Sequence, residues 1–124
     1  MTEIISEKAK TYDLEERTTK FAEEVILFVK KLPNNLRFID IIRQLIRAAT
    51  SIGANYCEAD DASTKKDFVY KIGTCRRESK ETKHWIRMIT TAVSSLEAEA
   101  KHLLVEAQEL NLIFSSIVNR ILKQ

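Results

Sequence analysis

The chain has 124 residues, of which 44% are hydrophobic and 31% charged, and its formal net charge is +2 at pH 7. This balance is typical of one soluble globular domain and excludes a disordered chain. No apolar run approaches the ~20 residues of a membrane span. The segment around Glu3 and Glu7 has no apolar signal core, so we expect a cytoplasmic protein.

Four apolar stripes follow a polar first segment. Residues 1–12 lack a repeating apolar pattern, so we predict a tail or lead-in there and a bundle domain over residues 13–124. Within that domain, spacing that alternates between four and three residues places each stripe on one side of a helix. The stripes are Phe21, Val25, Phe28, Leu32; Phe38, Ile42, Leu45, Ala49, Ile52, Tyr56; Phe68, Ile72, Cys75, Ser79, Thr82, Ile86, Ile89; and Leu96, Ala100, Leu103, Ala107, Leu110, Phe114, Ile117, Ile121. Because the connections are short, we predict an all-α, antiparallel up-down-up-down four-helix bundle.

Polar residues mark the helix ends. Asp13 is expected to cap the first helix, which should end near Lys31. Asn34 or Asn35 is expected to cap the second helix, which should run to about Ala59.

The later helices have similar start signals. The third should begin after Thr64, which forms with Asp67 a pair similar to a capping box, and should end near Thr91. Ser94 and Glu97 have the spacing of a regular capping box. The fourth helix is therefore expected to start there and to continue almost to the end of the chain.

Two glycines and two cysteines lie within the second and third helices. Gly53 and Gly73 would be nearly level, which predicts a close approach of these two helices. Cys57 and Cys75 would differ in height by about 12 Å at ~1.5 Å per residue, whereas a disulfide needs Cα atoms within roughly 7 Å. We therefore expect reduced thiols, with Cys75 in the core.

Two Glu-x-x-His spacings suggest a metal centre, Glu81 with His84 and Glu99 with His102. Di-iron bundles use this element twice, with a further glutamate from each remaining helix. Those glutamates would be Glu23 or Glu24 and Glu58. The third stripe, however, turns His84 outward, and the fourth leaves His102 on a flank. We predict no metal or other cofactor, and a metal-binding bundle is a remote alternative.

The third helix carries a basic stripe. Residues 63–93 hold eight lysines and arginines against three acids, a net charge of +5. Four cations fall within about 60° around the helix, namely Arg76, Lys80, Lys83 and Arg87. Such a stripe suits phosphates or an acidic partner, and a solvated face is the plain alternative. No aromatic residue is interleaved along the stripe, so base stacking on a single strand is not expected.

Polar residues on the second and third helices form a second set. Arg43 and Arg47 should be level with Glu81 and Glu78, which predicts ion pairs between the helices. The whole set is Arg43, Gln44, Arg47, Ser51, Asn55, Glu78 and Glu81. We interpret it as a structural network that fixes helix register or a subunit interface, in preference to a catalytic site.

The apolar arcs are wider than a monomeric bundle needs. Exposed apolar surface often marks an interface, so we expect a homo-oligomer. Tyr70 and Trp85 are the candidate anchors of that interface.

Several motifs resemble one family. The segment Ser51-Ile52-Gly53-Ala54-Asn55-Tyr56-Cys57-Glu58, after Gln44-Leu45-Ile46-Arg47, resembles the second-helix signature of the 23S rRNA intervening-sequence protein family. Supporting matches are Tyr12 to Arg17 with Phe21, then Asp67-Phe68, Lys71-Ile72-Gly73, Arg77-Glu78, Glu81-Thr82 and Trp85. Many members have Glu-Gly where this chain has Glu58-Ala59, so the exit from the second helix is expected to differ.

The resemblance implies a bacterial four-helix bundle without established enzymatic activity. A similar bundle, the accessory protein of diversity-generating retroelements, forms a pentameric barrel that binds nucleic acid and a reverse transcriptase. The resemblance thus implies a homopentamer here. We expect a non-enzymatic protein that binds nucleic acid, or a nucleic-acid-processing partner, through the basic stripe. The alternative is a protein scaffold whose stripe docks an acidic protein surface.

Overall fold

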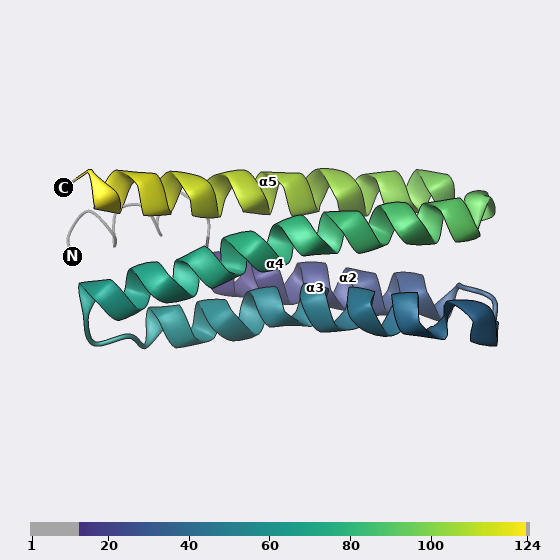
Figure 1. Cartoon of the computed structure of the whole chain (residues 1–124), viewed down its shortest axis with the longest axis horizontal. Helices are drawn as coiled ribbons and strands as arrows, with labels where there is room; N and C mark the ends of the chain where they lie inside the picture. Colours follow the sequence, from purple (N-terminus) through teal and green to yellow (C-terminus); the bar gives the residue numbers. More distant parts are fainter. Residues whose placement is uncertain (1–12, 124) are drawn as a thin grey trace.

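Four long α-helices form the part of the chain that the computed structural model describes, residues 13–123. They are α2 (Leu14–Lys30), α3 (Ile39–Asp60), α4 (Lys65–Ala92) and α5 (Glu97–Leu122), and they lie side by side along one long axis (Figure 1). Short 3₁₀ helices, η1 (Leu36–Phe38) and η2 (Ser94–Leu96), precede α3 and α5. The predicted all-α four-helix fold is confirmed. The tail predicted over residues 1–12 lies outside the described residues.

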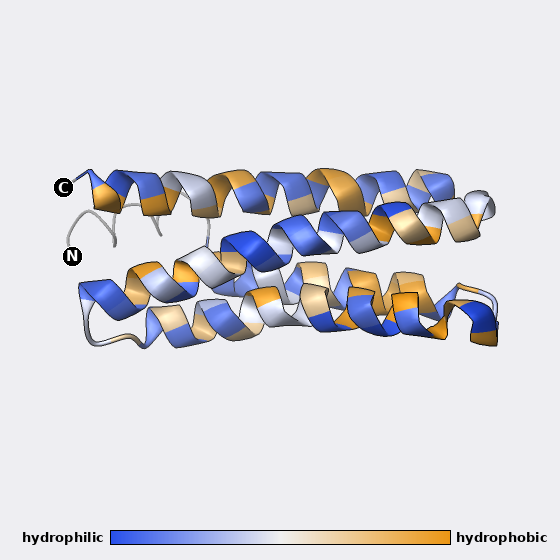
Figure 2. Ribbon diagram, viewed as in Figure 1, coloured by the Kyte–Doolittle hydropathy of each residue, from blue (hydrophilic) through white to orange (hydrophobic). Residues whose placement is uncertain are grey.

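The apolar stripes form the core. Apolar residues recur along each helix (Figure 2), and every member of the third stripe, from Phe68 to Ile89, is buried. Members near helix ends are only half-buried because fewer neighbours cover them there: Leu32, Phe38, Ile42 and Leu96. None of the helices in residues 13–123 combines the length and the hydropathy that crossing a membrane requires.

Three hydroxyl groups lie inside this core without a partner on another helix. Thr18, Ser79 and Thr82 are fully buried, and each donates a hydrogen bond of 2.7–2.8 Å to a carbonyl four residues earlier in its own helix. Their polar atoms are therefore satisfied locally, and the core needs no polar network between helices.

Three of the four expected caps form. The side chain of Asp13 accepts from the Glu16 amide, that of Asn35 from the Arg37 amide, and that of Thr64 from the Asp67 amide. Asn35 caps the short helix η1, which leads into α3.

The prediction that Ser94 caps the last helix is wrong. Ser94 lies inside η2, and α5 begins at Glu97 without a side-chain cap hydrogen bond. The one-turn 3₁₀ helix uses the residues that the capping-box spacing assigned to the helix start.

The prediction that the two glycines mark a close approach of α3 to α4 is also wrong, because Gly53 faces α2 instead. A Cβ on Gly53 would lie 3.3 Å from Oγ1 of Thr18, so this glycine lets α2 approach α3. A Cβ on Gly73 would meet only the Arg77 side chain of its own helix, at 3.9 Å. The two glycines have similar heights relative to the α3–α4 turn, but Gly53 lies on the side of α3 that faces α2.

The two cysteines are free thiols, as expected. Cys57 is exposed, whereas Cys75 is fully buried and its thiol donates to the Ile52 carbonyl at 3.5 Å. Burial raises the pKa of the Cys75 thiol to about 12, so this thiol is protonated at neutral pH.

Candidate nucleic-acid interface and its surroundings

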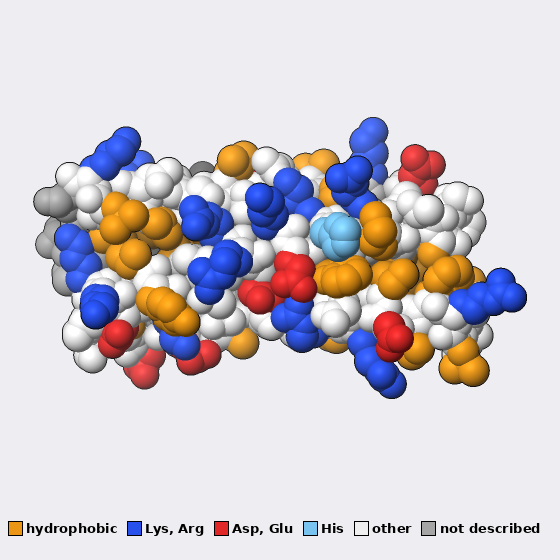
Figure 3. Space-filling model, viewed as in Figure 1, with side chains coloured by type: hydrophobic (Ala, Val, Ile, Leu, Met, Phe, Trp, Pro, Cys, Tyr) orange, Lys and Arg blue, Asp and Glu red, His pale blue; other side chains and the backbone are white. Residues whose placement is uncertain are grey.

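Helix α4 carries positive charge on the side that turns toward α5. Lysine and arginine side chains gather along α4 and the adjoining part of α5 (Figure 3). Lys80 and Arg87 are exposed, and Arg76 and Lys83 are half-buried. All four residues of the basic stripe thus lie on one flank of the helix, at the seam with α5.

Polar side chains of α5 contact the basic stripe from one side. The Lys83 ammonium donates to Oε1 of Gln108, and Nδ2 of Asn111 donates to the Arg76 carbonyl at 2.9 Å. These contacts fix the register of the stripe against α5. The sequence offered no signal for them, because Gln108 and Asn111 lie between core positions and belong to no motif.

A shallow hollow of about 330 Å³ lies at the Arg87 end of the stripe. Its lining includes Arg87 from α4 and Lys101 from α5, together with the acidic Glu97. Lys101 extends the basic surface onto a second helix. Sequence reasoning missed it because the stripe was defined on one helix alone.

The other flank of α4, toward α3, carries acidic residues. Arg47 donates to Oε2 of Glu78 at 3.2 Å, to Oε1 of Glu81, and to Oε1 of Gln44 at 3.0 Å. The Trp85 indole donates to Oε1 of Glu81 at 3.1 Å. The bond from Trp85, together with those from Arg47, lowers the pKa of Glu81, so this carboxylate is charged at neutral pH.

The rest of the expected polar network stays within α3. Arg43 pairs with Asp40 of its own helix at 3.6 Å and does not reach Glu78 or Glu81. Ser51 donates to the Arg47 carbonyl, and the Asn55 amide donates to the Ser51 carbonyl. Arg43 is mostly exposed, so it finds its acid one turn away in solvent. Of the residues in this set on α3, Arg47 is the one that pairs with α4; outside the set, Lys71 of α4 pairs with Glu58 of α3 at 2.9 Å.

The two expected interface anchors lie far apart. Tyr70 is 64% exposed near the start of α4, whereas Trp85 is half-buried and held by Glu81. Fifteen residues separate them, about 22 Å along a helix. They therefore belong to different parts of the surface.

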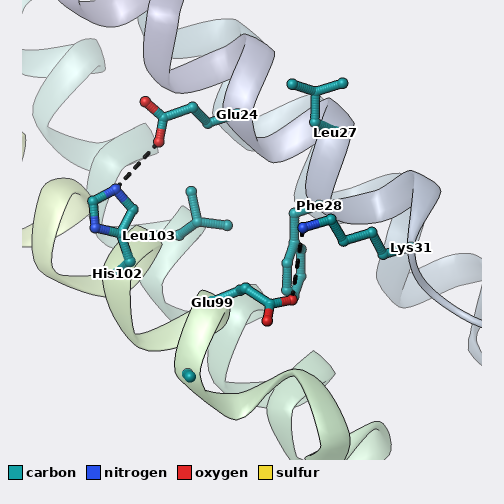
Figure 4. A pocket seen from close by; sticks show the side chains of 8 residues that line it. Glu24, Leu27, Phe28, Lys31, Glu99, His102 and Leu103 are labelled. Atoms are coloured by element: carbon teal, nitrogen blue, oxygen red, sulfur yellow. Dashed lines mark ion pairs between the residues drawn. The ribbon is translucent and has the colours of Figure 1, made fainter.

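A groove also separates α2 from α5. It has a volume of about 410 Å³, and Phe28 and Leu103 point into it (Figure 4). Two polar contacts cross the groove, one at each end. They join Glu24 to His102 at 3.4 Å and Lys31 to Glu99 at 3.9 Å.

A third contact, an ion pair, joins the same two helices further along. Arg17 donates to both carboxylate oxygens of Glu106, at 2.8 and 2.7 Å, and to Glu109 at 3.1 Å. Partial burial opposes ionisation of Glu106, but the hydrogen bonds and charge of Arg17 outweigh it and lower the pKa of Glu106. This bidentate pair is the best-shielded ion pair between α2 and α5 that the structure gives.

The two histidines have separate surroundings. His84 is exposed on α4 beside Trp85, and His102 lies at the α2–α5 groove with Glu24. Within residues 13–123, no three His, Cys, Asp or Glu side chains are grouped closely enough to hold a metal ion. The two Glu-x-x-His elements are thus not brought together.

The fold and surface define a small all-helical bundle with one basic flank. The family model of the 23S rRNA-intervening sequence protein matches residues 10–116, and the chain belongs to this family. It is similar to a crystal structure of a protein with unknown function from the S23 ribosomal protein family of Bacteroides thetaiotaomicron. The identity is 26% and the TM-score 0.76, covering 84% of this chain and 96% of that chain. A comparison with curated proteins gave no match.

Proposed function

We propose that this bundle is a non-enzymatic protein of the cytoplasm that binds nucleic acid through the basic stripe of α4 and Lys101 of α5. The observation that carries the proposal is the division of α4 into two flanks. Arg76, Lys80, Lys83 and Arg87 lie on the α5 flank, while Glu78 and Glu81 lie on the other flank and both pair with Arg47.

This separation of charge favours an anionic ligand. Four cations on one flank repel one another by a few tenths of a kcal/mol per pair, so an isolated bundle gains nothing from the stripe. Phosphates relieve that repulsion, and each contact releases a counterion. The family name refers to 23S rRNA, which is consistent with a nucleic-acid ligand.

We further propose that the chain self-associates, as a pentamer by analogy with the related retroelement accessory bundle. Tyr70 is the stronger candidate anchor because most of its surface is exposed. Trp85 offers only the part of its ring that Glu81 and His84 leave open. Light scattering on a sizing column should give about five times the 14.3 kDa chain mass, and Tyr70→Lys should lower it. A monomer at micromolar concentration would contradict self-association.

Salt dependence tests the nucleic-acid proposal. If all four stripe residues contact phosphates of a B-DNA duplex, log affinity should fall with log salt with a slope of about −3.6, roughly −0.9 per contact. Replacing Arg76, Lys80, Lys83 and Arg87 by Gln should remove most of the affinity and most of the slope.

The matched control removes the same charge elsewhere. Lys20, Lys30, Arg37 and Lys123 are exposed and lie outside α4, and their replacement by Gln changes the net charge equally. We expect this control to keep most of the affinity and the slope. Equal losses in both variants would show attraction by net charge alone. Undiminished binding by the stripe variant would refute the assignment and favour the protein scaffold.

A further inference from the structure

An exposed aromatic ring lies at the edge of the basic stripe. His84 is exposed on the crest of α4, and its imidazole meets the Trp85 indole edge-on, with ring centroids 4.8 Å apart and planes at 68°. The sequence pattern offered no ring within the stripe itself. The structure places one directly beside it.

The Trp85 indole that contacts the imidazole is itself fixed in place. This indole donates a hydrogen bond to Glu81 at 3.1 Å, and Glu81 also accepts from Arg47 of α3. The indole is therefore tied to two helices and cannot rotate freely. An imidazole resting on a fixed indole loses little further freedom when a ligand covers its outer face.

Cations surround the same ring. On a helix, His84 lies one turn after Lys80 and just under one turn before Arg87, and it follows Lys83 in the chain. Toward α3, the acids Glu81 and Glu78 are already paired with Arg47. A strand whose phosphates contact Lys80 and Arg87 thus brings its sugars and bases to the level of the imidazole.

We propose that His84 is a stacking platform for an unpaired base of single-stranded RNA whose backbone lies on the basic stripe. This inference rests on the proposed function and narrows its ligand. Proteins recognise single strands by combining cations for the backbone with flat side chains, histidine included, for splayed bases. Bases inside a duplex are already stacked on one another, so a duplex gains nothing from this ring.

The test compares a 12-nucleotide single-stranded RNA with a duplex of the same sequence, at pH 8 and fixed salt. His84→Ala should weaken binding of the single strand by about five- to a hundred-fold, the usual effect of removing one stacked ring. Duplex binding should change by less than about two-fold. His84→Phe should keep the affinity for the single strand.

His102→Ala is the matched control, since the chain has two histidines and His102 lies at the α2–α5 groove. It should leave both affinities unchanged. If His84→Ala has no effect, or weakens single strand and duplex equally, stacking is overturned while backbone binding stands. If the parent protein binds neither RNA, the proposed function fails first, and that result is separate from the variant comparison.

Discussion

The seam between α3 and α4 and the seam between α2 and α5 hold the same bundle together in different ways. Between α3 and α4 the contact is the most extensive in the fold, and the Cys75 thiol reaches the backbone of Ile52. Between α2 and α5 the contact is sparse, and long side chains such as those of Arg17 and Glu106 span the distance. Close backbones exclude water, whereas separated backbones leave an open groove.

This difference has an energetic consequence. A side chain removed from a closed seam leaves a cavity, and the cost includes both the lost burial and the lost contacts. A side chain removed from the wall of a groove leaves space that water can enter. The two seams should therefore respond differently to the same kind of truncation.

The largest effect is expected at the closed seam. Ile52→Ala removes a fully buried side chain of α3 and should lower the free energy of unfolding by about 4 kcal/mol. Urea denaturation followed by circular dichroism measures it. A loss below about 2 kcal/mol would mean that α3 and α4 collapse into the space.

A smaller effect is expected at the open seam. Leu103→Ala truncates a side chain that is 3% exposed but lines the groove, so the loss should be about 2 kcal/mol, close to the transfer cost alone. The same denaturation measurement applies. If this loss equals that of Ile52→Ala, the groove is closed in solution.

The bidentate ion pair of the open seam comes next. Glu106→Gln should cost about 1–2 kcal/mol at pH 7, because Arg17 loses a charged partner at a part-buried site. The pKa of Glu106 lies below the ordinary glutamate value of 4.5, so its contribution is full above that value and is lost as pH falls through the folded pKa. The difference between parent and variant should therefore shrink as the pH falls below 4.5 and vanish once Glu106 is protonated in the folded protein. A difference that does not change with pH would contradict this account.

The smallest effect is expected at the exposed ion pair. Lys31 and Glu99 lie 3.9 Å apart with both side chains about half exposed. Glu99→Gln should change the free energy of unfolding by less than about 0.5 kcal/mol, and 0.5 M salt should reduce that difference further because salt screens exposed charges. A larger loss would show that this pair helps to hold the groove together.

The stripes predicted the fold well, because helical spacing depends only on the sequence of one helix at a time. The α4 stripe from Phe68 to Ile89 is buried throughout, and the caps at Asp13 and Thr64 form. These features need no knowledge of how the helices are arranged. The same reasoning identified the pairing of Arg47 with Glu78 and Glu81, since a short turn fixes the level of α4 against α3.

Features that depend on contacts between helices distant in sequence were not predictable in this way. Gly53 contacts Thr18 of α2, and Arg17 pairs with Glu106 of α5, 89 residues away. The sequence gives no measure of how α2 is rotated against either helix. For the same reason, the predicted pairing of Arg43 with an acid of α4 is wrong. Arg43 lies at the height of Glu81, but its side chain pairs with Asp40 of its own helix.

The difference in burial between Cys57 and Cys75 provides a chemical probe of opening in the bundle. An alkylating reagent should therefore modify the exposed Cys57 much faster than the buried Cys75. Cys75 can react only when α3 and α4 separate. Its modification rate, followed by mass spectrometry on the unaltered chain, therefore reports how often the closed seam opens, and a bound ligand that clamps these helices will slow it.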